Sequence, residues 1–173
     1  YRINTGGQQI VVGAEDATNP ADPDLDWDGD TGNIGDGGNS PNLVSTSTGT
    51  STYNNDVSSS YAGDADASDP SIPAGTPADI LNTERYDPTD DSTALVYQFD
   101  VASDHGLAAG DSLVVRLYFA EIFGGIDAAG ERVFDVAVNG AVPSVFDNVD
   151  PFGTAGANAG FMLEAEAVVD AAG

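Results

Sequence analysis

The stretch SLVVRLYFAEI, residues 112 to 122, decides the fold, because its side chains separate onto two faces of an extended chain. One face carries large apolar side chains only: Leu113, Val115, Leu117 and Phe119. The opposite face carries Val114, Arg116 and Tyr118. A period of two with β-branched and aromatic residues predicts a half-buried β-strand.

Other stretches in the second half of the chain repeat this pattern. In GFMLEAEAVV, residues 160 to 169, two glutamates oppose an apolar face. RVFDVAVNG, residues 132 to 140, and ALVYQFDV, residues 94 to 101, alternate as well, and Asn139-Gly140 is a hairpin signal. No stretch gives a convincing helical pattern. Short strands with turns between them predict an all-β fold, an antiparallel β-sandwich of the jelly-roll type.

The first half of the chain is richer in turns. YRINTGG, residues 1 to 7, and QQIVV, residues 8 to 12, are expected to form two short strands around a Gly-Gly turn. Residues 31 to 80 are dominated by Gly, Ser, Thr, Asn, Asp and Pro, which favour loops. So long a loop-rich stretch is often functional. The length of 173 residues suits one domain, so we expect a single domain over residues 1–173 with this insert.

The charge of the chain is strongly negative. It has 29 acidic residues against four basic ones, all arginine, and a formal net charge of -25. Such a surface repels itself unless salt screens it. A lysine-free acidic composition resembles proteins of halophilic archaea, and the alternative is an ordinary protein with an acidic partner-binding face. The same charge excludes a basic footprint for nucleic acid and disfavours an anionic membrane surface.

Cysteine is absent, so neither a disulfide framework nor a thiolate metal site is available. No stretch resembles a signal peptide or a membrane-spanning segment, and no direct membrane insertion is expected. A location outside the cell or at its surface is compatible with this composition.

An acidic loop offers the best metal candidate. Its aspartates stand at every second position, as in the opening of a calcium loop, and Gly29 would allow the tight turn: Asp24, Asp26, Asp28 and Asp30. The position that would hold a bidentate glutamate is Gly35, so the match is partial. The alternative is solvated acidic surface.

Catalysis has little support. His105 is the one histidine, and it lies in an expected turn. Nothing positions a serine beside it, and nothing selects a pair among the many carboxylates. We therefore expect no enzyme, and a glycoside hydrolase is the third hypothesis.

Five short motifs occur in the order typical of malectin domains, and the chain resembles that family over almost its whole length. The motifs are YRINTGG (1–7), the acid-rich segment around Trp27, NTERYDP (82–88), LYFAEIF (117–123), and ERVFDVAVNG (131–140) with VFDNVDPFGTAG after it.

Malectin domains are β-sandwiches that resemble carbohydrate-binding modules, so the resemblance implies binding of a glucose-containing oligosaccharide through loops at one end. Carried over by motif, the aromatic residues are Tyr86 and Phe123, with Tyr61 or Tyr53 as a further aromatic. Glu84, Arg85 and Glu121 are the expected hydrogen-bonding partners. In the alternative, these aromatics are packing residues, Glu121 is a structural acid, and Glu84 forms an ion pair with Arg132.

Two departures from the family pattern keep a second function open. Gly124 stands where the eukaryotic lectin has a second aromatic, and the family's closing strands are expected to be missing after residue 169 or supplied by another chain. The first hypothesis is a carbohydrate-binding module of a secreted or cell-surface protein from a halophile, with an oligosaccharide or surface glycan as partner. The alternative is a structural subunit of an extracellular filament, sheath or adhesion layer, self-associating by strand exchange and stabilised by calcium.

Overall fold

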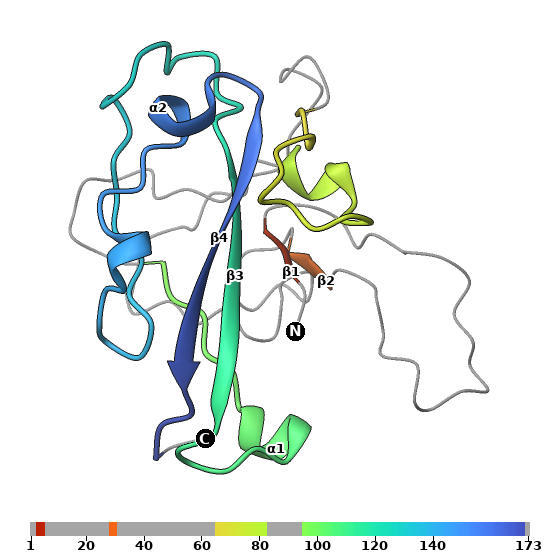
Figure 1. Cartoon of the computed structure of the whole chain (residues 1–173), viewed down its shortest axis with the longest axis vertical. Coiled ribbons are helices and arrows are strands. Elements are labelled where there is room, and N and C mark those ends of the chain that lie inside the picture. The colour runs from red at the N-terminus through yellow and green to blue at the C-terminus, as the bar shows by residue number, and fades with distance from the viewer. Residues whose placement is uncertain (1–2, 6–27, 31–64, 83–94, 172–173) are drawn as a thin grey trace. The chain divides into compact units, whose positions relative to one another are not determined.

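The computed structural model describes residues 3–5, 28–30, 65–82 and 95–171 (Figure 1). The chain divides into two compact units. The first unit comprises Tyr1–Ala62 and Pro77–Gln98, and the second comprises Gly63–Thr76 and Phe99–Gly173. The single-domain organisation expected from the length stays a prediction.

In the first unit, two short strands pair in parallel. β1 (Ile3–Thr5) lies beside β2 (Asp28–Asp30), with Ile3 opposite Asp28 and Thr5 opposite Asp30. The expected strand in YRINTGG is therefore confirmed over its central residues. A 3-10 helix, η1 (Ala78–Leu81), buries its last two side chains.

In the second unit, the two stretches with the clearest alternation form one antiparallel sheet. β3 (Ser112–Ala120) pairs along its full length with β4 (Gly160–Val168), so Ser112 lies opposite Val168 and Ala120 opposite Gly160. Both predicted strands are confirmed, and Figure 1 shows them side by side. Among the described residues this sheet has two strands, so the fold is β-rich and the sandwich stays a prediction.

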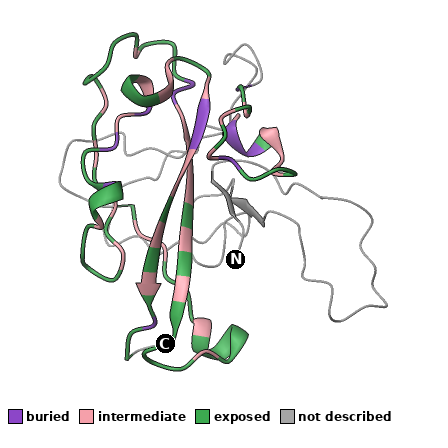
Figure 2. Cartoon of the chain, viewed as in Figure 1, coloured by how far each residue is buried: buried purple, intermediate pink, exposed green. Residues whose placement is uncertain are grey.

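The apolar face of this sheet carries the core of the unit. The ring of Phe119 lies 5.6 Å from that of Phe161 and 5.7 Å from that of Phe134, both in tilted arrangements favourable for aromatic pairs. Phe146 is completely buried. Figure 2 shows that burial is greatest where β4 begins and declines towards Val168.

The Asn139-Gly140 hairpin is confirmed. Val138 and Ala141 exchange both backbone hydrogen bonds around the two-residue turn, at 2.7 and 3.1 Å. Asn139 and Gly140 have positive φ values of 50° and 77°, which the type I′ turn requires and which these two residues tolerate best. The side-chain amide of Asn139 donates to the carbonyl of Val168 at 2.8 Å, so the turn is fixed to the end of β4.

The stretch before this hairpin differs from the expected continuous strand. Phe134 bridges Val149 and the N–H of Val136 bonds to the carbonyl of Phe146, but these are isolated contacts. The cause is a 3-10 helix, η2 (Ser144–Phe146), which follows Pro143 and turns Phe146 into the core.

Two five-residue helices were not expected from the sequence. α1 (Val101–His105) begins where the predicted strand at residues 94–101 should end, because the carboxylate of Asp100 accepts the N–H of Ser103 and caps a helix there. The predicted strand at residues 94–101 is thus wrong over its described residues, because residues 95–100 form only an isolated bridge at Tyr97. α2 (Pro151–Ala155) has the equivalent cap from Asp150. The two helices lie at opposite ends of the β3–β4 pair (Figure 1). No helix in the described part of the chain is long and apolar enough to cross a membrane.

Candidate functional site

A buried carboxylate marks the point where β3 ends. Glu121 follows directly after Ala120 and is only 1% exposed. Its carbonyl accepts the N–H of Asn158 at 2.8 Å, and it bridges Ala157 in parallel, so the backbone on both sides of it is fixed. A carboxylate taken out of water requires hydrogen bonds and a cation close by.

Both oxygens of that carboxylate have neighbours. Oε1 accepts the N–H of Phe123 at 3.0 Å. Oε2 lies 3.3 Å from Nε of Arg132, whose side chain is 30% exposed. The carboxylate therefore connects a loop residue two positions ahead with an arginine on a separate segment.

The ring of Phe123 remains exposed although its backbone is fixed. The residue is 43% exposed. Its carbonyl accepts the N–H of Ile126 at 3.1 Å, which closes a four-residue turn. The guanidinium carbon of Arg132 lies 5.9 Å from the ring centroid, within the range of a cation–π contact.

Two glycines in this turn have different surroundings. A Cβ on Gly125 would overlap the Phe123 ring, at 2.8 Å from its Cζ, so the ring packs directly on the Gly125 backbone. A Cβ on Gly124 would meet nothing within 4 Å. Where the ring now lies it leaves no room for a Cβ at residue 125, while residue 124 has room for a side chain.

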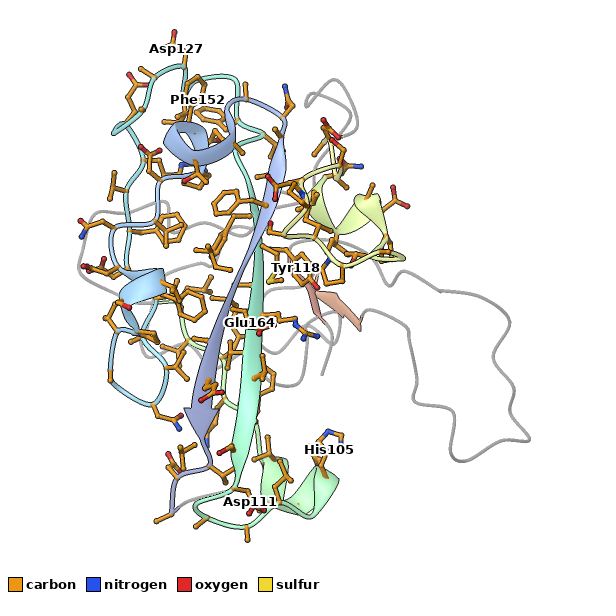
Figure 3. All side chains as sticks on the ribbon, viewed as in Figure 1. His105, Asp111, Tyr118, Asp127, Phe152 and Glu164 are labelled. Carbon is orange, nitrogen blue, oxygen red and sulfur yellow. The ribbon has the colours of Figure 1, made fainter. Side chains whose placement is uncertain are left out.

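The loop that follows is held by two more carboxylates. Oε2 of Glu131 accepts the N–H groups of Asp127 and Ala128, at 2.9 and 3.1 Å. Asp150, which caps α2, also accepts the N–H of Gly130 at 2.7 Å. Figure 3 shows Asp127 and Phe152 of α2 at one end of the β3–β4 pair, away from His105 and Asp111 at the other.

Of the sequence-predicted sugar-binding residues, Phe123 and Glu121 are described, and they lie in contact. The exposed ring of Phe123 agrees with a binding role. The burial of Glu121 favours the structural alternative, in which it supports Phe123 rather than contacts a ligand. The other members of the predicted set lie outside the described residues: Tyr86, Arg85, Glu84 and Tyr61.

The predicted metal ligands are described in part. Asp28 and Asp30 belong to β2, and Gly29 between them lies in the strand opposite Asn4, so the expected tight turn is not at this glycine. Asp24 and Asp26 lie outside the described residues. Within the part of the chain that the structure describes, no group of three or more acidic or histidine side chains could hold a metal ion.

Two members of the site were not identified from the sequence. Arg132 was considered only as a partner of Glu84, and its contact with Glu121 joins residues with no common motif. Gly125 was not singled out. The Gly-Gly pair directly after an expected ligand-binding aromatic was the available signal for close packing on the backbone.

Comparison with known proteins gives one family. The family model described as the Malectin domain matches residues 1–170 of the chain. No curated protein and no solved structure matches it.

Proposed function

The chain belongs to the malectin domain family, and from that premise we propose that it is a carbohydrate-binding module that uses the exposed ring of Phe123 as a stacking surface. The observation that carries this proposal is an apolar ring held outside the core by fixed neighbours. Exposed aromatic residues held in place are typical of binding sites.

The expected ligand is a neutral oligosaccharide. Sugars present C–H faces to an aromatic ring and hydroxyl groups to polar neighbours, and neither contact needs a charge on the ligand. A net charge of -25 repels anionic polysaccharides wherever salt does not screen it. Binding of glucose-containing chains, implied by the family resemblance, agrees with this charge balance.

The proposal also covers the fold, the location and the absence of catalysis. We expect an antiparallel sandwich around the β3–β4 sheet, an extracellular or cell-surface location in a salt-adapted organism, and no catalytic activity. The composition supports the salt-adapted setting, because acidic residues outnumber basic ones 29 to four.

The test is a panel of neutral and anionic oligosaccharides screened against the chain in high salt. Phe123→Ala should weaken the interaction with any ligand found by about tenfold or more, which is the loss expected for an aromatic anchor. Tyr86→Ala tests the second predicted aromatic. Phe99→Ala is the matched control, because Phe99 is also partly exposed but belongs to no predicted site. Absence of binding across the panel would reject the proposal.

The structural-subunit alternative is favoured by one observation only. Val114 and Val168, at 48% and 54% exposed, lie on the outer face of the same sheet. Light scattering in molar salt, with and without a calcium chelator, separates the two functions. A monomer indifferent to the chelator rejects the filament, and polymers favour it.

A further inference from the structure

We infer that Arg132 and Glu121 are positioning residues, which set the affinity of the site by holding the ring of Phe123 rather than by touching the ligand. The inference rests on the proposed function for its ligand, but the position of the ring can be measured without one.

The first step is the burial of Glu121. With 1% of its surface exposed, its charge is compensated by protein groups rather than by bulk water. One is the backbone N–H of Phe123 and another is the guanidinium of Arg132. The position of the guanidinium is therefore tied to a carboxylate whose own backbone is bonded to Asn158.

The second step is that both partners reach the same residue. The carboxylate holds the backbone of Phe123 through its N–H, at 3.0 Å. The guanidinium lies over its ring, 5.9 Å from the centroid. Packing of the ring on Gly125 adds a further restraint. Backbone and ring are thus restrained by different groups, which form an ion pair with each other.

The third step is the effect on binding. A side chain already held in its bound position loses less conformational freedom when a ligand arrives, so affinity rises without a new contact. A pair with one buried member is also screened little by salt. The ring should therefore keep its position at salt concentrations that weaken surface ion pairs.

The experiment uses the full chain with Arg132→Lys, Arg132→Gln and the control Arg116→Gln. Arg116 also pairs with a glutamate, Glu164, but on the exposed sheet face. The first measurement is the NMR chemical shift of the Gly125 α-protons, which the ring current of Phe123 displaces because the ring packs on them. Phe123→Leu supplies the value without a ring.

The second measurement is calorimetric titration with maltotetraose and cellotetraose. We expect the Gly125 shift to move towards the Phe123→Leu value in Arg132→Gln, less far in Arg132→Lys, and not at all in Arg116→Gln. Affinity should fall in the same order, by about tenfold for Arg132→Gln, as expected when a held side chain is released.

An unchanged Gly125 shift in the Arg132 variants overturns the inference. If the wild-type chain binds one of the sugars, an unchanged affinity in the Arg132 variants overturns it as well. If Arg132→Gln does not fold, Arg132→Lys decides, because it keeps a cation near Glu121. If the wild type binds neither sugar, glucan binding fails as the proposed function, and the Gly125 shift alone then decides whether the pair positions the ring.

Discussion

Two ion pairs among the described residues of the second unit differ in a way that their distances do not reveal. Arg116 and Glu164 approach to 2.7 Å, and their side chains are 52% and 45% exposed. Arg132 and Glu121 are farther apart, at 3.3 Å, but their exposures are 30% and 1%. Figure 3 places Glu164 midway along the sheet. The shorter pair is surrounded by water, and the longer pair has one member in the protein interior.

Burial, rather than distance, decides what each pair contributes. Exposed pairs are typically worth about 0–1 kcal/mol, because water and salt screen the charges and two long side chains lose freedom. Removing one partner of a buried pair leaves a charge without compensation, at about 3–5 kcal/mol. Glu164 can return to water when its partner is lost, whereas Glu121 cannot.

The largest expected effect comes from breaking the buried pair. Arg132→Gln should lower the free energy of unfolding by about 3 kcal/mol, since the buried carboxylate loses the guanidinium that lies beside it. Urea denaturation measures this loss. The double variant Glu121→Gln/Arg132→Gln should recover part of the stability because the buried charge is gone. A loss below about 1 kcal/mol would place the pair with ordinary surface pairs.

A smaller effect should come from moving the ring while leaving the pair intact. Gly125→Ala introduces a Cβ that overlaps the Phe123 ring, so the ring must shift. We expect a loss of stability below about 0.5 kcal/mol, as for other surface substitutions, because the ring is 43% exposed and can turn aside, but weaker binding of any oligosaccharide ligand. Gly124→Ala is the matched control, because its Cβ meets open space and should change neither property. If Gly125→Ala and Gly124→Ala have the same stability and the same affinity, the Phe123 ring does not pack on Gly125.

The exposed pair should respond weakly and in a salt-dependent way. Arg116→Gln is expected to lower the free energy of unfolding by less than about 1 kcal/mol, and the difference from wild type should shrink as salt rises. Bonding to Glu164 raises the pKa of Arg116, so its guanidinium stays charged at every pH at which the protein is studied. Denaturation at low and high salt gives the comparison. A loss as large as that of Arg132→Gln would refute the role of burial.

The smallest effect concerns a half-buried carboxylate, that of Asp69, beside β4. Hydrogen bonds from the hydroxyl and N–H of Ser71 lower the pKa of Asp69, and the same hydroxyl accepts the N–H of Met162. A lowered folded-state pKa means that its stabilisation is present above the ordinary aspartate pKa and is lost as pH falls through the folded value. Asp69→Asn should therefore flatten the stability profile below about pH 4, near the ordinary aspartate value.

Urea midpoints between about pH 3 and pH 6, a range that spans the ordinary aspartate pKa, give this profile. Ser71→Ala removes the hydroxyl donor and leaves Asp69 in place. It should flatten the stability profile less than Asp69→Asn does, because the Ser71 N–H still donates to Asp69. If stability falls with decreasing pH equally steeply in both variants and in the wild type, Asp69 does not contribute to the pH dependence of stability.

Much of the sheet could be predicted because alternation is a local property. Residues 112–122 and 160–169 separate into two faces in the sequence itself, and Asn139-Gly140 allows few turns other than the one found. α1 could not be predicted from alternation, because one capping carboxylate at Asp100 outweighs the pattern of the residues before it.

The site was predictable only where a motif carried it. The family motif picks out Phe123 and Glu121 but says nothing about burial. The burial of Glu121 favours a structural role, in which it holds the backbone of Phe123, over contact with a ligand. The ion pair between Arg132 and Glu121 depends on how two separate segments meet in space, and no spacing in the sequence encodes this.

The link between Asn139 and Val168 has a consequence for how the protein ages. Asparagine followed by glycine is the dipeptide most prone to deamidation, in which the side-chain amide is hydrolysed to a carboxylate. In this chain that amide is the donor to the carbonyl of Val168. Its loss would replace a donor by a negatively charged acceptor facing another acceptor, so one slow chemical event would release the hairpin tip from the strand end and add a further charge to an already acidic surface.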